Sequence, residues 1–333
     1  MRASLLERCT KQIQNETLLR KGHFLEFESM VKLGAMMYVD AGREVDVAEL
    51  KECKKILKQK VGIFSNLRGY MQYLVQIKMA LSGDPSGYVD GVLGVYEQLK
   101  SGLILPGERV SLAATVIYEN CPGYATSEVA RRTREAYEMV KQQHRFLTGE
   151  EDLAMLALIV MSGKNPAEAA AQAEELYASM KGDFIIGSDT PQTAAMILAL
   201  SDKPADQKVD DFFALYEACK AAGHATSRDK SMAIYAAFAD LEAERNEIVA
   251  EIGEVDEWLK GNKGYGALGI GGSMRRLFAA TIVLEDRQAN TLAAETGTTS
   301  AVAQAIVQDL LMILISIIVT TIVVSSIASS SSH

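Results

Sequence analysis

A pattern that recurs about every forty residues constrains the fold of this chain more than any other feature of its sequence. Tyrosines follow one another at spacings of 41, 40 and 39 residues, each with a lysine four residues later and an alanine seventeen residues later. Such a period is the signature of a repeat architecture, in which neighbouring units bury one another. The tyrosines are Tyr96, Tyr137, Tyr177 and Tyr216, the lysines are Lys100, Lys141, Lys181 and Lys220, and the alanines are Ala113, Ala154, Ala194 and Ala233.

Each repeat is expected to contain two helices. The first carries the tyrosine and the lysine, and the second is rich in small and aliphatic residues, as in DLAMLALIV at 152–160. A helix that is apolar nearly all round is covered on several sides, so the second helix is predicted to lie inside. No segment alternates with a period of two residues between hairpin turns. The sequence therefore predicts an all-α fold, an α-α superhelical solenoid of two-helix repeats of about 40 residues with HEAT/armadillo-like stacking.

The domain organisation follows from these repeats. A degenerate repeat is expected upstream, with Leu57 in the tyrosine column and Leu74 in the alanine column, because terminal repeats lack a neighbour on one side. Downstream, an acidic helix is predicted from Asp240 to Lys260. The predicted parts are N-terminal helices with the degenerate repeat (1–80), four helical pairs (81–240), the acidic helix, a Gly-rich loop and a capping helix (241–290), a linker (291–300), and an apolar C-terminal helix with a Ser-rich end (301–333).

The tyrosine and lysine columns allow two interpretations. In the structural one, each tyrosine ring packs on the alanine of its inner helix, and the lysine lies along the same face one turn later. In the functional one, the four Tyr/Lys pairs line a concave surface and hold an anionic or extended ligand. We favour the structural interpretation, because a repeated packing role is enough to explain residues that recur in every unit.

Charge and cysteine content exclude several classes of function. The net charge is −9, and residues 150–260 alone carry 9 Lys/Arg against 22 Asp/Glu. Nucleic acid is therefore not expected as a partner, because binding to phosphates needs a basic surface. The cysteines, Cys9, Cys53, Cys121 and Cys219, are far apart and have no histidine at ligand spacing, so we expect reduced, mostly buried thiols in the cytosol. The acidic helix carries no Glu-x-x-His motif, so neither a metal site nor a cofactor is predicted.

A glycine cluster between residues 261 and 272 leads into the predicted capping helix. Gly264, Gly266 and Gly269 match G-x-G-x-x-G by spacing, but the dinucleotide motif requires a preceding strand, and a charged helix precedes this one. Free amides at the start of the next helix, with the side chains of Ser273, Arg275 and Arg276, could hold a phosphate or carboxylate. The alternative is a connector followed by a helix with exposed arginines. If the chain is an enzyme, His144 and His224 are the first candidates for a general base.

The C-terminal segment is strongly apolar. Residues 310–324 read LLMILISIIVTTIVV and contain eleven Leu, Ile or Val, and no charged residue follows Asp309. With the uncharged residues to 328, the segment approaches the roughly 20 residues that span a bilayer. Because the arginines lie on its N-terminal side, a spanning segment would leave the protein at the cytoplasmic face of the membrane. The alternative is a last solenoid helix packed on the array, which would make the protein cytoplasmic.

The repeats around YEQLK, YEMVK, YASMK and YEACK, the glycine stretch leading into SMRRLFAATIVLED, and the Ser-rich apolar tail resemble the bacterial domain-of-unknown-function family DUF4003. The resemblance extends over essentially the whole chain. It implies a bacterial, helix-rich protein and assigns no catalytic residue. We expect a non-catalytic binding or scaffold protein with a protein partner, because helix arrays present long binding surfaces. The alternative is an enzyme, or a protein that binds an anionic small ligand near the Gly-rich loop.

Overall fold

The protein is described by a computed structural model, in which every regular element of the described residues is helical. The residues described are 1–22, 28–62, 65–68, 72–101, 107–121, 123, 125–143, 152–183, 190–227, 230–239, 241 and 243–294. The predicted all-α class is thereby confirmed at the level of secondary structure. The apolar segment 310–328 and His144 lie outside these residues. Among the helices described, none is both long and apolar enough to cross a membrane.

The chain divides into two compact units. The first contains residues 1–9, 139–147 and 162–314, and the second contains 10–138, 148–161 and 315–333. The boundary between them therefore falls within α1 (Ala3–Lys21) and within α7 (Thr126–Gln143). Each unit is described separately below.

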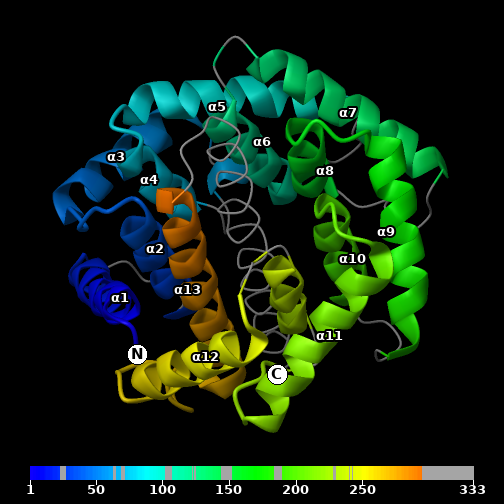
Figure 1. Cartoon of the computed structure of the whole chain (residues 1–333). Coiled ribbons are helices and arrows are strands. Elements are labelled where there is room, and N and C mark those ends of the chain that lie inside the picture. Colours follow the sequence, from blue (N-terminus) through cyan, green and yellow to red (C-terminus); the bar gives the residue numbers. More distant parts are fainter. Residues whose placement is uncertain are drawn as a thin grey trace, which may run out of the picture. The chain divides into compact units, whose positions relative to one another are not determined.

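The second unit contains the degenerate repeat and the first helical pair (Figure 1). Helix α4 packs against α2, α3 and α5, and α6 packs against α5 and α8. Leu57 and Leu74, which the sequence places in the repeat columns, are both buried. The elements of this unit, besides parts of α1 and α7, are α2 (Glu28–Asp40), α3 (Val47–Lys60), η1 (Asn66–Arg68), α4 (Gln72–Leu81), α5 (Pro85–Leu99), α6 (Glu108–Asn120) and α8 (Asp152–Met161).

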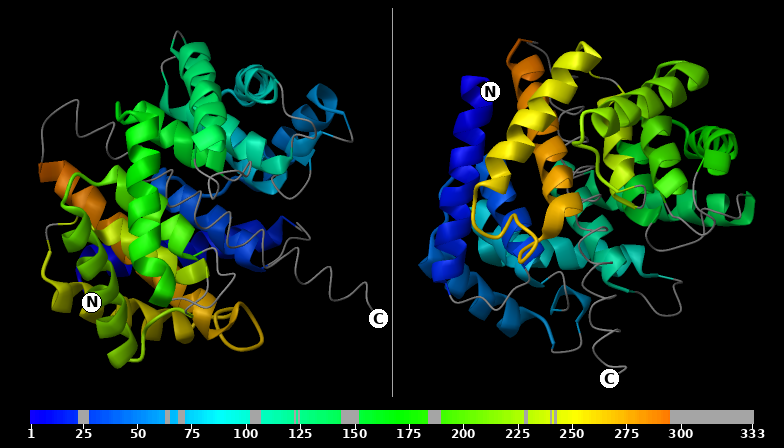
Figure 2. Two further views of the ribbon diagram at one scale, coloured as in Figure 1. Left: turned by 90° about the vertical axis from the view of Figure 1, so that its right-hand side faces the viewer. Right: turned by 90° about the horizontal axis from the view of Figure 1, so that it is seen from below.

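The first unit contains the last two pairs and the C-terminal helices. Helix α10 packs against α9 and η3, η3 also contacts α11 and α13, and α12 packs along α13 (Figure 2). The fourth pair closes with a 3-10 helix rather than an α-helix. The elements are α9 (Pro166–Met180), η2 (Lys181–Asp183), α10 (Thr190–Leu200), α11 (Ala205–Ala221), η3 (Lys230–Phe238), α12 (Arg245–Lys260) and α13 (Gly271–Ala294).

Local signals place the helix starts and ends between pairs. Asp84 caps α5 by accepting from the amide of Gly87, and Asn165 caps α9 by accepting from the amide of Ala167. A proline follows each cap at the first helical position, where its fixed φ suits the helix and no amide hydrogen is needed. Gly163, just after α8, has a φ of 80°, a conformation that other residues adopt only with strain.

The alanine column lies at the core of the helical pairs. All four alanines are at most 1% exposed, and each lies in the second helix of its pair. The neighbouring aliphatic residues are buried as well, so that all residues of α8 from Asp152 to Val160 are shielded from water. This near-complete burial is what the all-round apolar pattern predicts.

Two predicted boundaries at the C-terminal end are wrong. The acidic helix begins at Arg245 rather than at Asp240. Of the residues before it, Leu241, Ala243 and Glu244 are not helical. Helix α13 continues to Ala294, so the first four residues of the predicted linker are helical. The sequence also places an apolar seam on this helix, and its members Ile248, Ile252, Val255 and Leu259 are buried, whereas Leu241 precedes α12 and is only half-buried.

The acidic face of α12 is only partly solvated. Glu251 is 8% exposed, and its carboxylate binds the guanidinium groups of Arg2 and Arg287. The carboxylate of Glu254 forms an ion pair with the amino group of Met1 at 2.9 Å. These contacts join the first residues of the chain to α12 and α13 within one unit.

Candidate ligand-binding pocket

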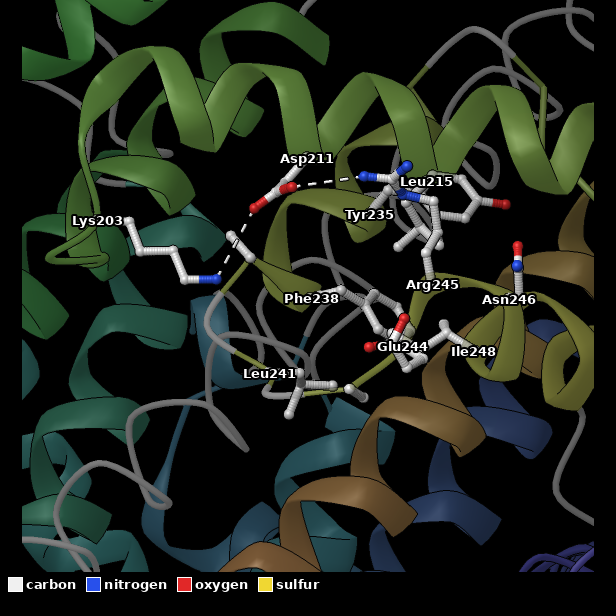
Figure 3. Close-up of a pocket in the computed structure, with 12 residues that line it drawn as sticks. Lys203, Asp211, Leu215, Tyr235, Phe238, Leu241, Glu244, Arg245, Asn246 and Ile248 are labelled. Carbon is white, nitrogen blue, oxygen red and sulfur yellow. Dashed lines mark ion pairs between the residues drawn. The ribbon is translucent and has the colours of Figure 1, made fainter.

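A pocket of about 370 Å³ opens in the first unit between the start of α11, the end of η3 and the start of α12 (Figure 3). Its lining combines an apolar floor with a charged rim. A volume of this size falls in the range of small-molecule sites, which extends from about 300 to 1,000 Å³. The lining residues are Lys203, Asp211, Leu215, Tyr235, Phe238, Ala239, Leu241, Ala243, Glu244, Arg245, Asn246 and Ile248.

The floor is made by side chains that the core holds in place. Tyr235, Phe238 and Ile248 are each at most 5% exposed. The hydroxyl of Tyr235 accepts a hydrogen bond of 3.1 Å from the amide of Thr226, and its ring stacks edge-on against Tyr216 at 5.7 Å. Because its hydroxyl and ring are both engaged and its side chain is fully buried, Tyr235 holds the floor of the pocket rigid from beneath and offers little surface of its own to a ligand.

Among the residues that the structure describes, the rim carries four charged side chains, Lys203, Asp211, Glu244 and Arg245. The carboxylate of Asp211, on α11, lies 3.8 Å from the ammonium nitrogen of Lys203 and 3.6 Å from a guanidinium nitrogen of Arg245 (Figure 3). Both distances exceed that of a hydrogen bond, so one carboxylate is shared loosely by two cations. Glu244 precedes Arg245 in the chain, and in Figure 3 its carboxylate lies below Arg245, away from Asp211 and beside Phe238.

The predicted site residues Ser273, Arg275 and Arg276 lie in a different part of the same unit, in the first turns of α13. The Nε of Arg275 donates to a carboxylate oxygen of Asp256 at 2.6 Å, and Arg276 approaches the other oxygen at 3.6 Å. His224 contacts that second oxygen through Nδ1 at 2.9 Å. Gly253 leaves room for the imidazole, because a Cβ there would lie 2.9 Å from its Cδ2.

Asp256 thus organises a buried charge cluster, which we define as Asp256, Arg275, Arg276 and His224. Burial alone would raise the pKa of Asp256. Hydrogen bonds from Arg275 and His224, together with the charges of both arginines, lower that pKa below its ordinary value. The carboxylate is therefore ionised at neutral pH and compensates the guanidinium groups.

This arrangement decides what the charge cluster can do chemically. Arg275 is 7% exposed and also donates to the carbonyl of Tyr265, while Arg276 donates to the carbonyl of Ala225. The hydroxyl of Ser273 donates to that of Ser227 and accepts from its amide. An anion entering here would compete with Asp256 for both arginines, so the predicted anion site stays a prediction with little room for its ligand.

The charge cluster also bears on metal binding. Ligand atoms of His224, Asp256 and Glu257 lie within 4.8 Å of one another, close enough to share a cation. However, both oxygens of Asp256 already face guanidinium groups. Two positive charges at the same carboxylate oppose a divalent ion, so we assign no metal to these residues.

The tyrosine and lysine columns are less uniform than the alanine column. Tyr137 and Tyr216 are buried, whereas Tyr96 and Tyr177 are half-buried. Lys100 lies 5.6 Å from the ring centre of Tyr96, and Lys220 lies 6.0 Å from that of Tyr216. In these two repeats the lysine therefore lies over the tyrosine ring of the same repeat. Lys141 and Lys181 are exposed.

Sequence reasoning missed both the pocket and the central carboxylate of the charge cluster. The pocket residues come from three elements and share no spacing or motif, and Tyr235 reads simply as part of an apolar inner helix. Asp256 is one acidic residue among several on α12. One available signal was its position next to Val255: the apolar residues of α12 face the core, and Asp256 lies on the same buried side of the helix.

Comparison with known proteins gives one match. The model of the family described as "Protein of unknown function (DUF4003)" matches residues 18–320 of the 333. No curated protein and no solved structure matches the chain.

Proposed function

The chain belongs to the DUF4003 family, and we propose that it is a non-catalytic binding protein whose ligand occupies the pocket between α11, η3 and α12. The observation that carries this proposal is the combination of a buried aromatic floor and a charged rim in one pocket. Most of the exposed lining is polar, so the placed charges carry the recognition, and the half-buried Leu241 adds apolar contact. The helical pairs serve as the framework that holds both.

A neutral fluorescent probe tests whether this pocket binds at all. We expect N-phenyl-1-naphthylamine to bind the full-length chain saturably with increased emission. Leu241→Trp, which fills the pocket, should weaken binding at least tenfold. The matched control is Leu268→Trp, because Leu268 is fully exposed on the loop between α12 and α13 and does not line the pocket. Equal binding by the two variants, or no saturable binding by the parent protein, would contradict the proposal.

We further propose that the helical pairs stack as an α-α superhelical solenoid. Three observations support this: the repeated columns, the packing of α5 on α6 and of α9 on α10, and the contacts between successive inner helices, α6 with α8 and α10 with η3. Such stacking gives each inner helix the cover that its apolar surface requires.

The apolar segment 310–328 supports a second proposal, that the protein is tail-anchored at the cytoplasmic face of a membrane. Its eleven Leu, Ile and Val residues between 310 and 324 favour insertion by about 0.3 to 0.6 kcal/mol each. The full-length chain should then stay with membranes after an alkaline carbonate wash, whereas a chain ending at Asp309 should be soluble. Release of the full-length protein by the wash would rule out a spanning segment.

A further inference from the structure

The four charges on the rim of the pocket are not equivalent. Lys203, Asp211 and Arg245 form one group with a net charge of +1, since a single carboxylate serves two cations. Glu244 forms the other, and within the part of the chain that the structure describes no cation lies in ion-pair distance of its carboxylate. In Figure 3 the first group lies near α11, and Glu244 lies below Arg245, away from Asp211 and next to Phe238.

This separation of charge selects among ligands. A ligand that carries only a carboxylate would neutralise the net positive charge of the first group and leave Glu244 facing the ligand without a partner. A ligand that carries only an amine would leave the two cations uncompensated. Displacing water from an unpaired charge costs free energy, so the pocket favours a ligand that bears both charges.

The size and the floor of the pocket define the rest of the ligand. Phe238 and Leu241 lie beside Glu244, and because Phe238 is only 5% exposed, the half-buried Leu241 offers most of the apolar surface that a group attached close to the amine can reach. The volume of about 370 Å³ suits a single small molecule. An amine, a carboxylate and an apolar group joined at one carbon meet all three requirements.

We infer that the pocket binds a free apolar α-amino acid, with its carboxylate at Lys203 and Arg245, its ammonium group at Glu244, and its side chain on Phe238 and Leu241. This inference rests on the proposed binding function and names the class of ligand. Neither Lys203 nor Arg245 makes a hydrogen bond with Asp211. Both cations can therefore turn to the carboxylate of the ligand, whether or not they keep their ion pairs with Asp211.

Calorimetric titration of the full-length protein with three matched compounds tests the inference. L-phenylalanine carries both charges, 3-phenylpropanoate lacks the amine, and 2-phenylethylamine lacks the carboxylate. We expect L-phenylalanine to bind at least tenfold more tightly than either analogue. Glu244→Gln should weaken L-phenylalanine about tenfold and leave 3-phenylpropanoate unchanged, whereas Arg245→Gln should weaken both acids and leave 2-phenylethylamine unchanged. Glu247→Gln, on the same helix but outside the pocket, should have no effect.

The contrary outcomes are distinct. If the neutral probe binds but L-phenylalanine is no tighter than its singly charged analogues, the amino-acid assignment is wrong and the pocket remains a binding site. If N-acetyl-phenylalanine or phenylalanine amide binds as tightly as the free amino acid, the assignment is also overturned, in favour of a peptide end. If neither the probe nor any of these compounds binds, the proposed function itself fails.

Discussion

At the scale of single residues, Asp256 is the most consequential side chain of the first unit. It is 1% exposed, accepts hydrogen bonds from Arg275 and His224, and lies 3.6 Å from the guanidinium group of Arg276. A buried ion pair adds little net stability compared with apolar packing, but breaking it leaves an uncompensated charge in the core. Asp256 therefore acts as a structural requirement of the junction between α12 and α13.

Replacing Asp256 by Asn should lower the free energy of unfolding by about 3 kcal/mol at pH 7, because Arg275 loses its counter-charge. Urea denaturation measures the change. The neighbouring substitution Glu257→Gln is the control, since Glu257 pairs with Lys260 at the surface and its loss should cost less than about 0.5 kcal/mol. Equal effects of the two substitutions would show that the buried cluster does not stabilise the fold.

The loss of stability caused by Asp256→Asn should depend on pH in one definite direction. Because the folded-state pKa of Asp256 is lowered, its contribution is complete above the unfolded-state pKa near 4 and is lost as the pH falls through the folded-state value. The deficit of Asp256→Asn should therefore be largest at neutral pH and shrink below about pH 4. A deficit that stayed constant to pH 3 would contradict the lowered pKa.

At the scale of elements, close approach between helices depends on a few glycines. A Cβ at Gly91 on α5 would lie 2.0 Å from the ring of Tyr118 on α6, whereas a Cβ at Gly94 on the same helix meets nothing within 4 Å. The two positions share a helix and differ only in the face that they occupy.

These glycines give a matched pair of substitutions. Gly94→Ala should raise the free energy of unfolding by about 0.5 to 1 kcal/mol, because alanine restricts the unfolded chain and favours helix. Gly91→Ala should lower it by about 1 to 3 kcal/mol, because Tyr118 must move. Thermal or urea unfolding of both variants measures the contrast. If both substitutions stabilise the protein, the contact between α5 and α6 is looser than described.

The elements are also where sequence reasoning succeeded best. The inner helices and the buried alanine column were predictable, because burial on all sides leaves a continuous apolar signal of helical length. The start of α12 was not, since the acidic residues of the sequence between 240 and 244 continue its pattern, although Leu241, Ala243 and Glu244 are not helical. The pocket could not be predicted either, because Lys203, Tyr235 and Arg245 meet only through the packing of three elements.

At the scale of the whole molecule, the proposed stacking of helical pairs makes a prediction about chain length. Duplicating residues 165–203, which span one complete pair, should yield a folded protein with proportionally more helical ellipticity, because the added pair presents the same faces to its neighbours. Circular dichroism and urea denaturation measure this. Duplicating only residues 165–184, the outer half, is the control and should destabilise the protein. Equal destabilisation by both insertions would contradict the solenoid.

The buried alanine column also has an evolutionary consequence. All four alanines are at most 1% exposed, so a larger side chain at these sites would have to displace close-packed neighbours, and we expect substitution there to favour the smallest residues. Innovation must then occur elsewhere, on the outer helices and on the rim of the pocket, where a change does not push the helices apart. Members of the family should accordingly diverge in what they recognise while keeping the same internal spacing.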